Sequence, residues 1–245
     1  MVKPLTHGRM GNFLFQAATA MSYAWDHYIP FTLPTESLRK NLYPVYLQHL
    51  VHPRWDPSLP VVDIKEKGFS FQSLPYQEEW SERNIILDGY WQSEKYFRHH
   101  RAQLLTAFGL QWFNRPGKIS VHVRRGDYLK LPHKHPPVTK AWYEMAMKKF
   151  VGYRFIFFSD DINWCKQEFG SRMDVAFSEG RTEQEDLILM SECEHHICSA
   201  STFSWWGAWL NQNPKKRVVI PRLWFTPGWK GFDTKDIVPP EWEKL

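Results

Sequence analysis

Short apolar runs and amphipathic segments alternate along the second half of the chain. The runs are rich in β-branched and aromatic residues and predict buried strands at Ile119–Val123, Tyr153–Phe158, Met173–Phe177, His195–Cys198 and Arg217–Ile220. Apolar residues at helical spacing between them predict helices at Thr139–Phe150, Ile162–Phe169, Thr182–Cys193 and Ser204–Asn211. Alternating strands and helices are typical of a parallel sheet covered by helices, so this half is expected to be a doubly wound α/β lobe.

The first half of the chain has a weaker pattern. A helix is predicted at Asn12–Asp26 after a glycine-containing turn, a strand at Asn84–Gly89, and a further helix from Tyr96 to Phe108. Residues 30–80 are rich in proline, tryptophan and charge, which favours loops with short strands. Pro4 lacks the N–H that a ladder needs and is expected to interrupt the first strand.

Chain length and a turn-like segment divide the protein into two lobes. The 245 residues suffice for two lobes with a core each. Asn114-Arg-Pro-Gly117 favours a loop and sets the expected domains at residues 1–115 and 116–245.

Composition excludes several classes of protein. The net charge of +5 would suit nucleic acid, an anionic membrane or an acidic small substrate, but no nucleic-acid-reading motif is present. Three cysteines give an odd count whose spacing fits neither a zinc knuckle nor a redox pair, so reduced thiols are expected. No apolar stretch reaches the roughly twenty residues of a membrane span, and we expect a soluble, cytoplasmic enzyme.

Two arginines and a carboxylate follow the first strand of the second lobe, in the string His122-Val-Arg-Arg-Gly-Asp-Tyr128. Adjacent guanidiniums suit a diphosphate, and the nearby carboxylate could accept a proton. A surface ion pair between Arg125 and Asp127 is the alternative. On an extended strand His122 and Arg124 share one face, whereas Arg125 shares the opposite face with Val121 and Val123.

A second string, Cys198-Ser-Ala-Ser-Thr-Phe-Ser-Trp-Trp-Gly-Ala-Trp-Leu210, predicts a strand end, a hydroxyl-rich turn and a helix that opens near Ser204. Free N–H groups at a helix N-terminus favour an anion, and Ser201 and Thr202 would add hydroxyl donors. An ordinary helix cap followed by tryptophans of the core is the alternative. Both strings are expected at the carboxyl ends of parallel strands, where α/β folds bind ligands.

These strings, together with Gly8-Arg-Met-Gly-Asn12 and Gly89-Tyr-Trp-Gln-Ser-Glu-Lys-Tyr-Phe97, resemble the α-1,2-fucosyltransferases of glycosyltransferase family 11. The resemblance implies a GT-B-type α/β fold with two Rossmann-like lobes and a donor cleft between them. It also implies inverting transfer of L-fucose from GDP-β-L-fucose to a galactose-containing glycan, at O2 of a terminal galactose. Protein O-fucosylation, transfer of fucose or another deoxyhexose to a different glycan position, and a non-catalytic GDP-sugar-binding module are the alternatives.

The resemblance also assigns roles to residues. Arg124 would bind the diphosphate, His122 would lie near guanine, and Asp186 would accept from the guanine N1–H and amine, unless it only complements its helix dipole. Arg124 and Asp127 are the expected catalytic residues, with Asp127 as the base. The remaining expected substrate-binding residues are Arg9, Asn12, Ser201, Thr202 and Phe203.

No metal is expected. Ser159-Asp-Asp161 follows a strand, as metal-binding aspartates often do, but it directly precedes a helix, and capping of that helix explains it better. The spacing of His133, His135, His195 and His196 does not fit zinc ligands. The donor GDP-fucose would therefore bind without a cofactor, because Arg124 and the helix N-terminus can neutralise the leaving diphosphate.

Overall fold

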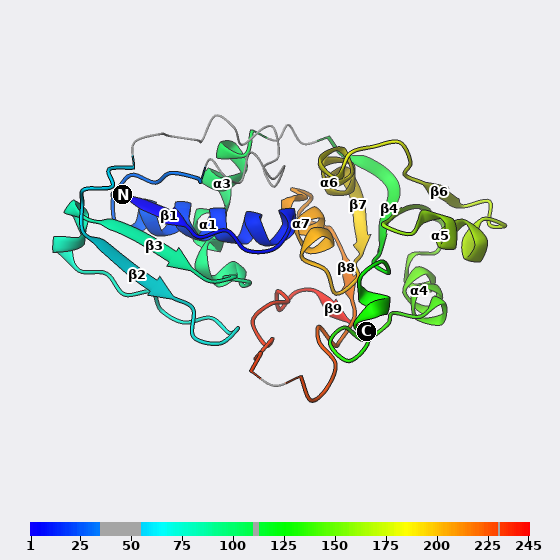
Figure 1. The fold of residues 1–245 in the computed structure, drawn as a ribbon. Coiled ribbons are helices and arrows are strands. Elements are labelled where there is room, and N and C mark those ends of the chain that lie inside the picture. The colour runs from blue at the N-terminus through cyan, green and yellow to red at the C-terminus, as the bar shows by residue number, and fades with distance from the viewer. Residues whose placement is uncertain (35–54, 110–112, 230) are drawn as a thin grey trace. The chain divides into compact units, whose positions relative to one another are not determined.

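The computed structural model describes residues 1–34, 55–109, 113–229 and 231–245, which form two compact units (Figure 1). The first unit comprises Met1–Leu110 and Gly231–Pro239, and the second comprises Gln111–Lys230 and Pro240–Leu245. The sequence places a single boundary at residue 115, whereas in the structure a late segment returns to the first unit. Asp236 holds it there, because its carboxylate accepts from the N–H of Phe71 and pairs with Lys95.

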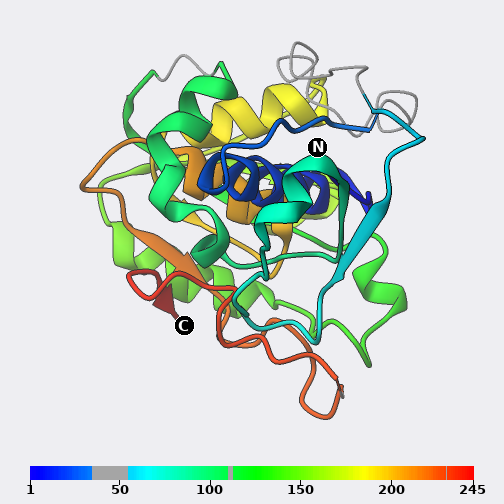
Figure 2. The same ribbon diagram turned by 90° about the vertical axis from the view of Figure 1, so that its left-hand side faces the viewer.

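The first unit contains a three-stranded parallel sheet with the order β1-β3-β2, whose strands are labelled in Figure 1; Figure 2 shows its cyan strand β2 and the blue helix α1 from another side. Its strands and main helix are β1 (Val2–Pro4), α1 (Met10–Asp26), β2 (Val61–Lys65) and β3 (Asn84–Asp88). The expected interruption at Pro4 is wrong: this residue ends β1 and pairs with Leu87. Proline is tolerated because β1 is an edge strand and Pro4 is its last residue.

The helix expected from Tyr96 to Phe108 begins later than predicted. After β3 the chain makes two short 3-10 turns, η3 (Glu94–Tyr96) and η4 (Arg98–His100), and then the helix α3 (Arg101–Ala107). A further 3-10 turn, η2 (Glu78–Glu82), precedes β3. Phe97 between η3 and η4 has φ −144°, which no α-helix allows, and its side chain is fully buried. Burial of this aromatic side chain overrides the local preference for a continuous helix.

Six parallel strands form the sheet of the second unit, in the order β6-β5-β4-β7-β8-β9. They are β4 (Arg115–Val123), β5 (Arg154–Ser159), β6 (Val175–Phe177), β7 (Cys193–Ile197), β8 (Val218–Ile220) and β9 (Glu243–Lys244). All five predicted strands are present, and β9 is an addition that the sequence did not suggest. The α/β class and the two parallel-sheet lobes are confirmed.

Helices connect these strands and complete the layers of the second unit. They are η5 (Tyr128–Lys130), α4 (Lys140–Met147), η6 (Lys148–Phe150), α5 (Ile162–Phe169), α6 (Glu183–Glu192) and α7 (Thr202–Leu210). The predicted capping box at Thr182 is confirmed, because Thr182 and Glu185 bond each other's backbone N–H. Helix α7 starts at Thr202, two residues before the predicted start at Ser204, because the Ser201 side chain caps it.

One face of this sheet carries a continuous hydrophobic core. Buried residues of β4 and β5 meet residues of α4 and α5 there, namely Ile119, Val121, Val123, Phe155 and Phe157 with Tyr143, Ala146, Met147, Cys165 and Phe169. Burial of this much apolar surface supplies the main stabilisation of the unit. Helix α6 packs against α7, where a Cβ at Gly207 would come within 3.0 Å of Met190.

Candidate functional site

The strand order of the second unit creates a switch point between β4 and β7. From β4 the chain proceeds outward through β5 and β6, then returns to the other side of β4 as β7 and continues to β8 and β9. In doubly wound sheets, ligands bind at the carboxyl ends of the two strands where this reversal occurs. Both predicted strings lie there, since Arg124 follows β4 and Ser201 lies four residues beyond β7.

His122 and Ser199 meet across this switch point. The Nδ1 atom of His122 lies 2.8 Å from the Oγ atom of Ser199, and both side chains are buried. Burial, and secondarily the charge of Arg124, lowers the pKa of His122 to about 3. The imidazole is therefore neutral and acts as a hydrogen-bonding group, with the ring of Phe203 against it at 5.5 Å between centroids.

Arg124 is held between two carboxylates. Its Nη2 atom donates to the Oδ1 atom of Asp127 at 2.6 Å, and its Nη1 atom lies 3.0 Å from the Oδ2 atom of Asp160. The Arg124 side chain is only 14% exposed, whereas that of Asp127 is 56% exposed. The guanidinium is thus fixed at the strand end by Asp160, while its contact with Asp127 faces water and is readily exchanged.

Arg125 has a different and mainly structural environment. Its Nε atom donates to the Oδ2 atom of Asp161 at 3.0 Å, and its guanidinium lies 4.1 Å from the ring centroid of Trp164 on α5. The alternative of an ion pair between Arg125 and Asp127 is wrong, because Asp127 pairs with Arg124 instead. Arg125 lies toward α5, as expected for the strand face opposite to that of Arg124.

The aspartates after β5 serve the arginines and a helix. Asp161 accepts from the N–H of Trp164 and so caps α5, as the sequence predicts. Asp160 accepts from the N–H of Arg125 at 2.9 Å and pairs with the Arg124 side chain. Gly126 is required beside it, because a Cβ there would lie 2.5 Å from an Asp160 oxygen.

The N-terminus of α7 follows shortly after Ser199, the hydrogen-bond partner of His122. Ser201 accepts from the N–H of Phe203 at 3.4 Å, so its hydroxyl acts as the helix cap. Thr202 and Phe203 form the first turn and are partly exposed, which leaves this helix end accessible. An anion placed here would meet the positive end of the helix dipole.

Asp186 lies in the first turn of α6, where it accepts a hydrogen bond from the Ser178 hydroxyl at 2.6 Å. Burial is the largest influence on this carboxyl and raises its pKa, while the bond from Ser178 and the charge of Arg181 oppose the rise. The bonds that the structure records for Asp186 do not join it to His122 or Phe203. Its role toward guanine stays a prediction.

Arg9 and Asn12 belong to the first unit, at the start of α1. The Oδ1 atom of Asn12 accepts from the Nε2 atom of Gln92 at 2.9 Å, which ties the helix start to the loop after β3. Gly8 has φ +75°, and a Cβ there would lie 2.1 Å from the Asn12 side-chain nitrogen. The glycine therefore allows the close turn that places Asn12.

The sequence suggests no individual role for Ser199 or Tyr128, and only a metal-binding or helix-capping role for Asp160. In the structure Ser199 contacts His122, and Asp160 and Tyr128 contact Arg124. The Tyr128 hydroxyl donates to the carbonyl of Ala200 at 3.0 Å, its ring stacks on His135 at 3.8 Å, and burial raises its pKa to about 12. Tyr128 thereby fastens the loop after β4 to the loop after β7.

Comparison with known proteins identifies the family. A model of glycosyl transferase family 11 matches residues 63–245. The chain belongs to this family. An alpha-1,2-colitosyltransferase of Escherichia coli is 35% identical over 182 residues, which are 64% of this chain and 61% of that protein. The chain therefore spans less than two thirds of the length of this relative.

More distant relatives cover more of the chain. The galactoside alpha-(1,2)-fucosyltransferase 2 of Oryctolagus cuniculus is 26% identical over 273 residues, covering 92% of this chain and 75% of that enzyme. Among solved structures, POFUT1 in complex with GDP-fucose aligns with a TM-score of 0.49 and 11% identity, covering 89% of this chain and 96% of that one.

Two further expectations concern the state of the cysteines and the presence of membrane-spanning helices. The three cysteines, Cys165, Cys193 and Cys198, are free and buried, as expected for reduced thiols. In the part of the chain that the structure describes, no helix is both long and apolar enough to cross a membrane.

Proposed function

We propose that this family 11 member is a GDP-fucose-dependent enzyme that transfers L-fucose to a galactose-containing glycan, at O2 of a terminal galactose, with inversion. The observation that carries the proposal is Arg124, a guanidinium fixed at the switch point of a doubly wound sheet beside the N-terminus of α7. The names of the colitosyl- and fucosyltransferase relatives support the α-1,2 linkage and the galactoside acceptor. We assign the donor to the second unit and the acceptor to the first.

The donor diphosphate would bind Arg124 on the side that pairs with the exposed carboxylate of Asp127. The planar guanidinium suits two diphosphate oxygens, and the first N–H groups of α7 add donors nearby. Because Asp127 is more than half exposed, diphosphate oxygens can take its place on Nη2, while Asp160 keeps Nη1 in position. Binding of the donor would thus release the Asp127 carboxylate from its ion pair.

The released carboxylate gives the reaction its base. The acceptor hydroxyl oxygen forms a bond to the anomeric carbon of fucose as the bond from that carbon to the β-phosphate oxygen breaks. The bonding electrons leave with GDP, and the hydroxyl proton passes to Asp127. Arg124 and the α7 N-terminus stabilise the negative charge that develops on the diphosphate. No metal or other cofactor is required by this scheme.

The other predicted residues would complete recognition of the substrates. His122 stays neutral because its pKa is lowered to about 3, and it would lie with Phe203 and Asp186 on the guanine side of the donor. Ser201 and Thr202 would frame the diphosphate. Arg9 and Asn12 of the first unit are assigned to substrate contacts through the tight turn at Gly8.

The test is an acceptor panel with GDP-fucose, with released GDP as the readout and product linkage determined by NMR. We expect GDP release with terminal galactosides and an α-1,2-linked product. Asp127→Asn should keep GDP affinity and lose most of kcat, since it removes the proton acceptor and leaves Arg124 in place. GDP binding without transfer to any acceptor would indicate a non-catalytic module, and transfer only to folded proteins would contradict the galactoside assignment.

A further inference from the structure

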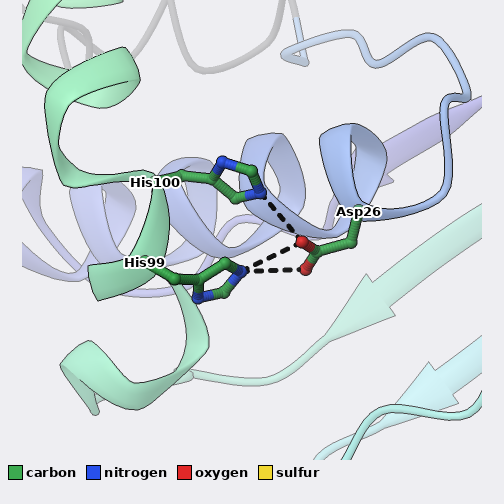
Figure 3. Close-up of side chains that lie close together, drawn as sticks. All are labelled: Asp26, His99 and His100. Atoms are coloured by element: carbon green, nitrogen blue, oxygen red, sulfur yellow. Dashed lines mark hydrogen bonds and ion pairs between the residues drawn. The ribbon is translucent and has the colours of Figure 1, made fainter.

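Three side chains of the first unit that can bind metal ions converge on its surface. Asp26 is the last residue of α1, and His99 and His100 lie in the turn η4. The Nε2 atoms of His99 and His100 lie 3.0 and 2.8 Å from the Oδ1 atom of Asp26. Figure 3 shows both imidazoles turned toward this one carboxylate. The potential ligand atoms all lie within 4.8 Å of one another.

We propose that Asp26, His99 and His100 bind one divalent transition-metal ion, of which Zn²⁺ fits best, with water completing its coordination. Two imidazoles and one carboxylate suit Zn²⁺ and its neighbours in the first transition series, whereas Mg²⁺, Ca²⁺ and Mn²⁺ prefer oxygen ligands. With metal–ligand bonds of about 2.0–2.1 Å in tetrahedral geometry, neighbouring ligand atoms lie roughly 3.3 Å apart. To admit the ion, the Asp26 contacts would widen slightly, and any pair of ligand atoms that lies nearer the 4.8 Å limit would close toward this distance.

The surroundings of His100 favour the tautomer that a metal ligand needs. Its Nδ1 atom is bonded to the Oε1 atom of Gln103. When Nδ1–H donates to this amide oxygen, the neutral ring presents the lone pair of Nε2 toward Asp26. A lone pair facing a carboxylate oxygen is unfavourable unless a metal ion or a proton lies between them. Metal-binding histidines commonly donate their second ring N–H to such an oxygen, which fixes the orientation of the ring.

Packing also fixes the position of the ligands. Trp25 contacts the edge of the His100 ring at 5.3 Å between centroids, and the Ser22 hydroxyl lies 3.3 Å from the Nε2 atom of His99. The His100 side chain is 18% exposed, whereas Asp26 and His99 are 39% and 48% exposed. The ion would thus have a supported inner side and an open side through which it enters.

The site would act as a structural clamp. It joins the end of α1 to a turn 73 residues later in the chain, so an ion that binds only the folded arrangement would stabilise the first unit by its binding free energy. The residues proposed to bind the GDP moiety belong to the second unit. Binding of the ion should therefore raise thermal stability and leave GDP affinity unchanged, which separates this proposal from the proposed function.

The experiment titrates Zn²⁺ into the full chain after removal of metal with EDTA, by calorimetry and thermal denaturation. Co²⁺ serves as a spectroscopic probe, because its visible absorption reports coordination by imidazole nitrogen. We expect one ion per chain and a rise in Tm. His99→Gln and Asp26→Asn each remove a ligand with little change in shape and should weaken Zn²⁺ affinity at least tenfold.

Two control variants separate this site from general binding to histidine. His7→Gln removes a histidine whose Nε2 atom lies 2.8 Å from Asp88 without a second imidazole, and His133→Gln removes an exposed histidine. Both should retain wild-type affinity. The proposal is overturned if the wild type and His99→Gln bind Zn²⁺ equally, or if Zn²⁺ leaves the wild-type Tm unchanged. That second result would leave the cluster as two histidines that share hydrogen bonds with one carboxylate.

Discussion

Replacement of Arg124 by lysine tests the centre of the proposed donor site. Arg124 uses two nitrogens, Nη1 and Nη2, toward Asp160 and Asp127 at 3.0 and 2.6 Å. Lysine offers a single ammonium, so it can keep one of these directions and lose the other. A hydrogen bond to a charged group contributes about 1.5–3 kcal/mol, which corresponds to a roughly 10- to 150-fold weaker Kd for GDP.

Arg125→Lys is the matched control for this substitution. Arg125 pairs with Asp161 and lies over Trp164, and a lysine ammonium cannot reproduce the stacking of the planar guanidinium, so the replacement should lower the free energy of unfolding by about 0.5–2 kcal/mol. Its effect on GDP affinity should stay within about twofold, well below the tenfold step that 1.4 kcal/mol represents. Calorimetric titration of GDP and urea unfolding of both variants separate the two effects. Equal losses of GDP affinity in the two variants would refute the assignment of Arg124 to the diphosphate.

The other predictions concern guanine, pH and metal. Asp186→Asn would place an amide donor against the donor edge of guanine. An unpaired buried group costs about 1–3 kcal/mol, so GDP binding should weaken roughly ten- to a hundredfold. An unchanged Kd would leave Asp186 only its hydrogen bond from Ser178. His122 has a pKa lowered from 6.5 to about 3, so folding favours its neutral form. Its stabilising contribution is complete above pH 6.5 and falls by about 1.4 kcal/mol per pH unit between pH 6.5 and 3, so urea unfolding of wild type and His122→Asn should converge as pH falls through this range. Transfer activity measured below the unfolding temperature should survive EDTA; its full loss, restored by Mn²⁺, would make Asp160 and Asp161 metal ligands.

Local sequence patterns were sufficient for the α-helices of the second unit and for all of its strands except β9. The buried strand β8 is a continuous apolar run, and the capping box at Thr182 marks a helix start through bonds between neighbouring residues. Such features depend on interactions within one turn or one strand, which the sequence displays directly. The pattern failed where distant packing decides the conformation, as at Phe97, whose burial breaks the expected helix.

The sequence by itself placed the paired arginines, Arg124 and Arg125, and the serine-rich helix start at the ends of strands. Only the tertiary structure decided that these strand ends are neighbours at a switch point, that Asp127 pairs with Arg124, and that Asp160 holds the same guanidinium. It also brought Asp26 to His99 and His100 and returned residues 231–239 to the first unit. The physical reason is that local periodicity sets which face of an element is apolar, whereas the partner of a polar side chain depends on strand order and packing between residues far apart in the chain.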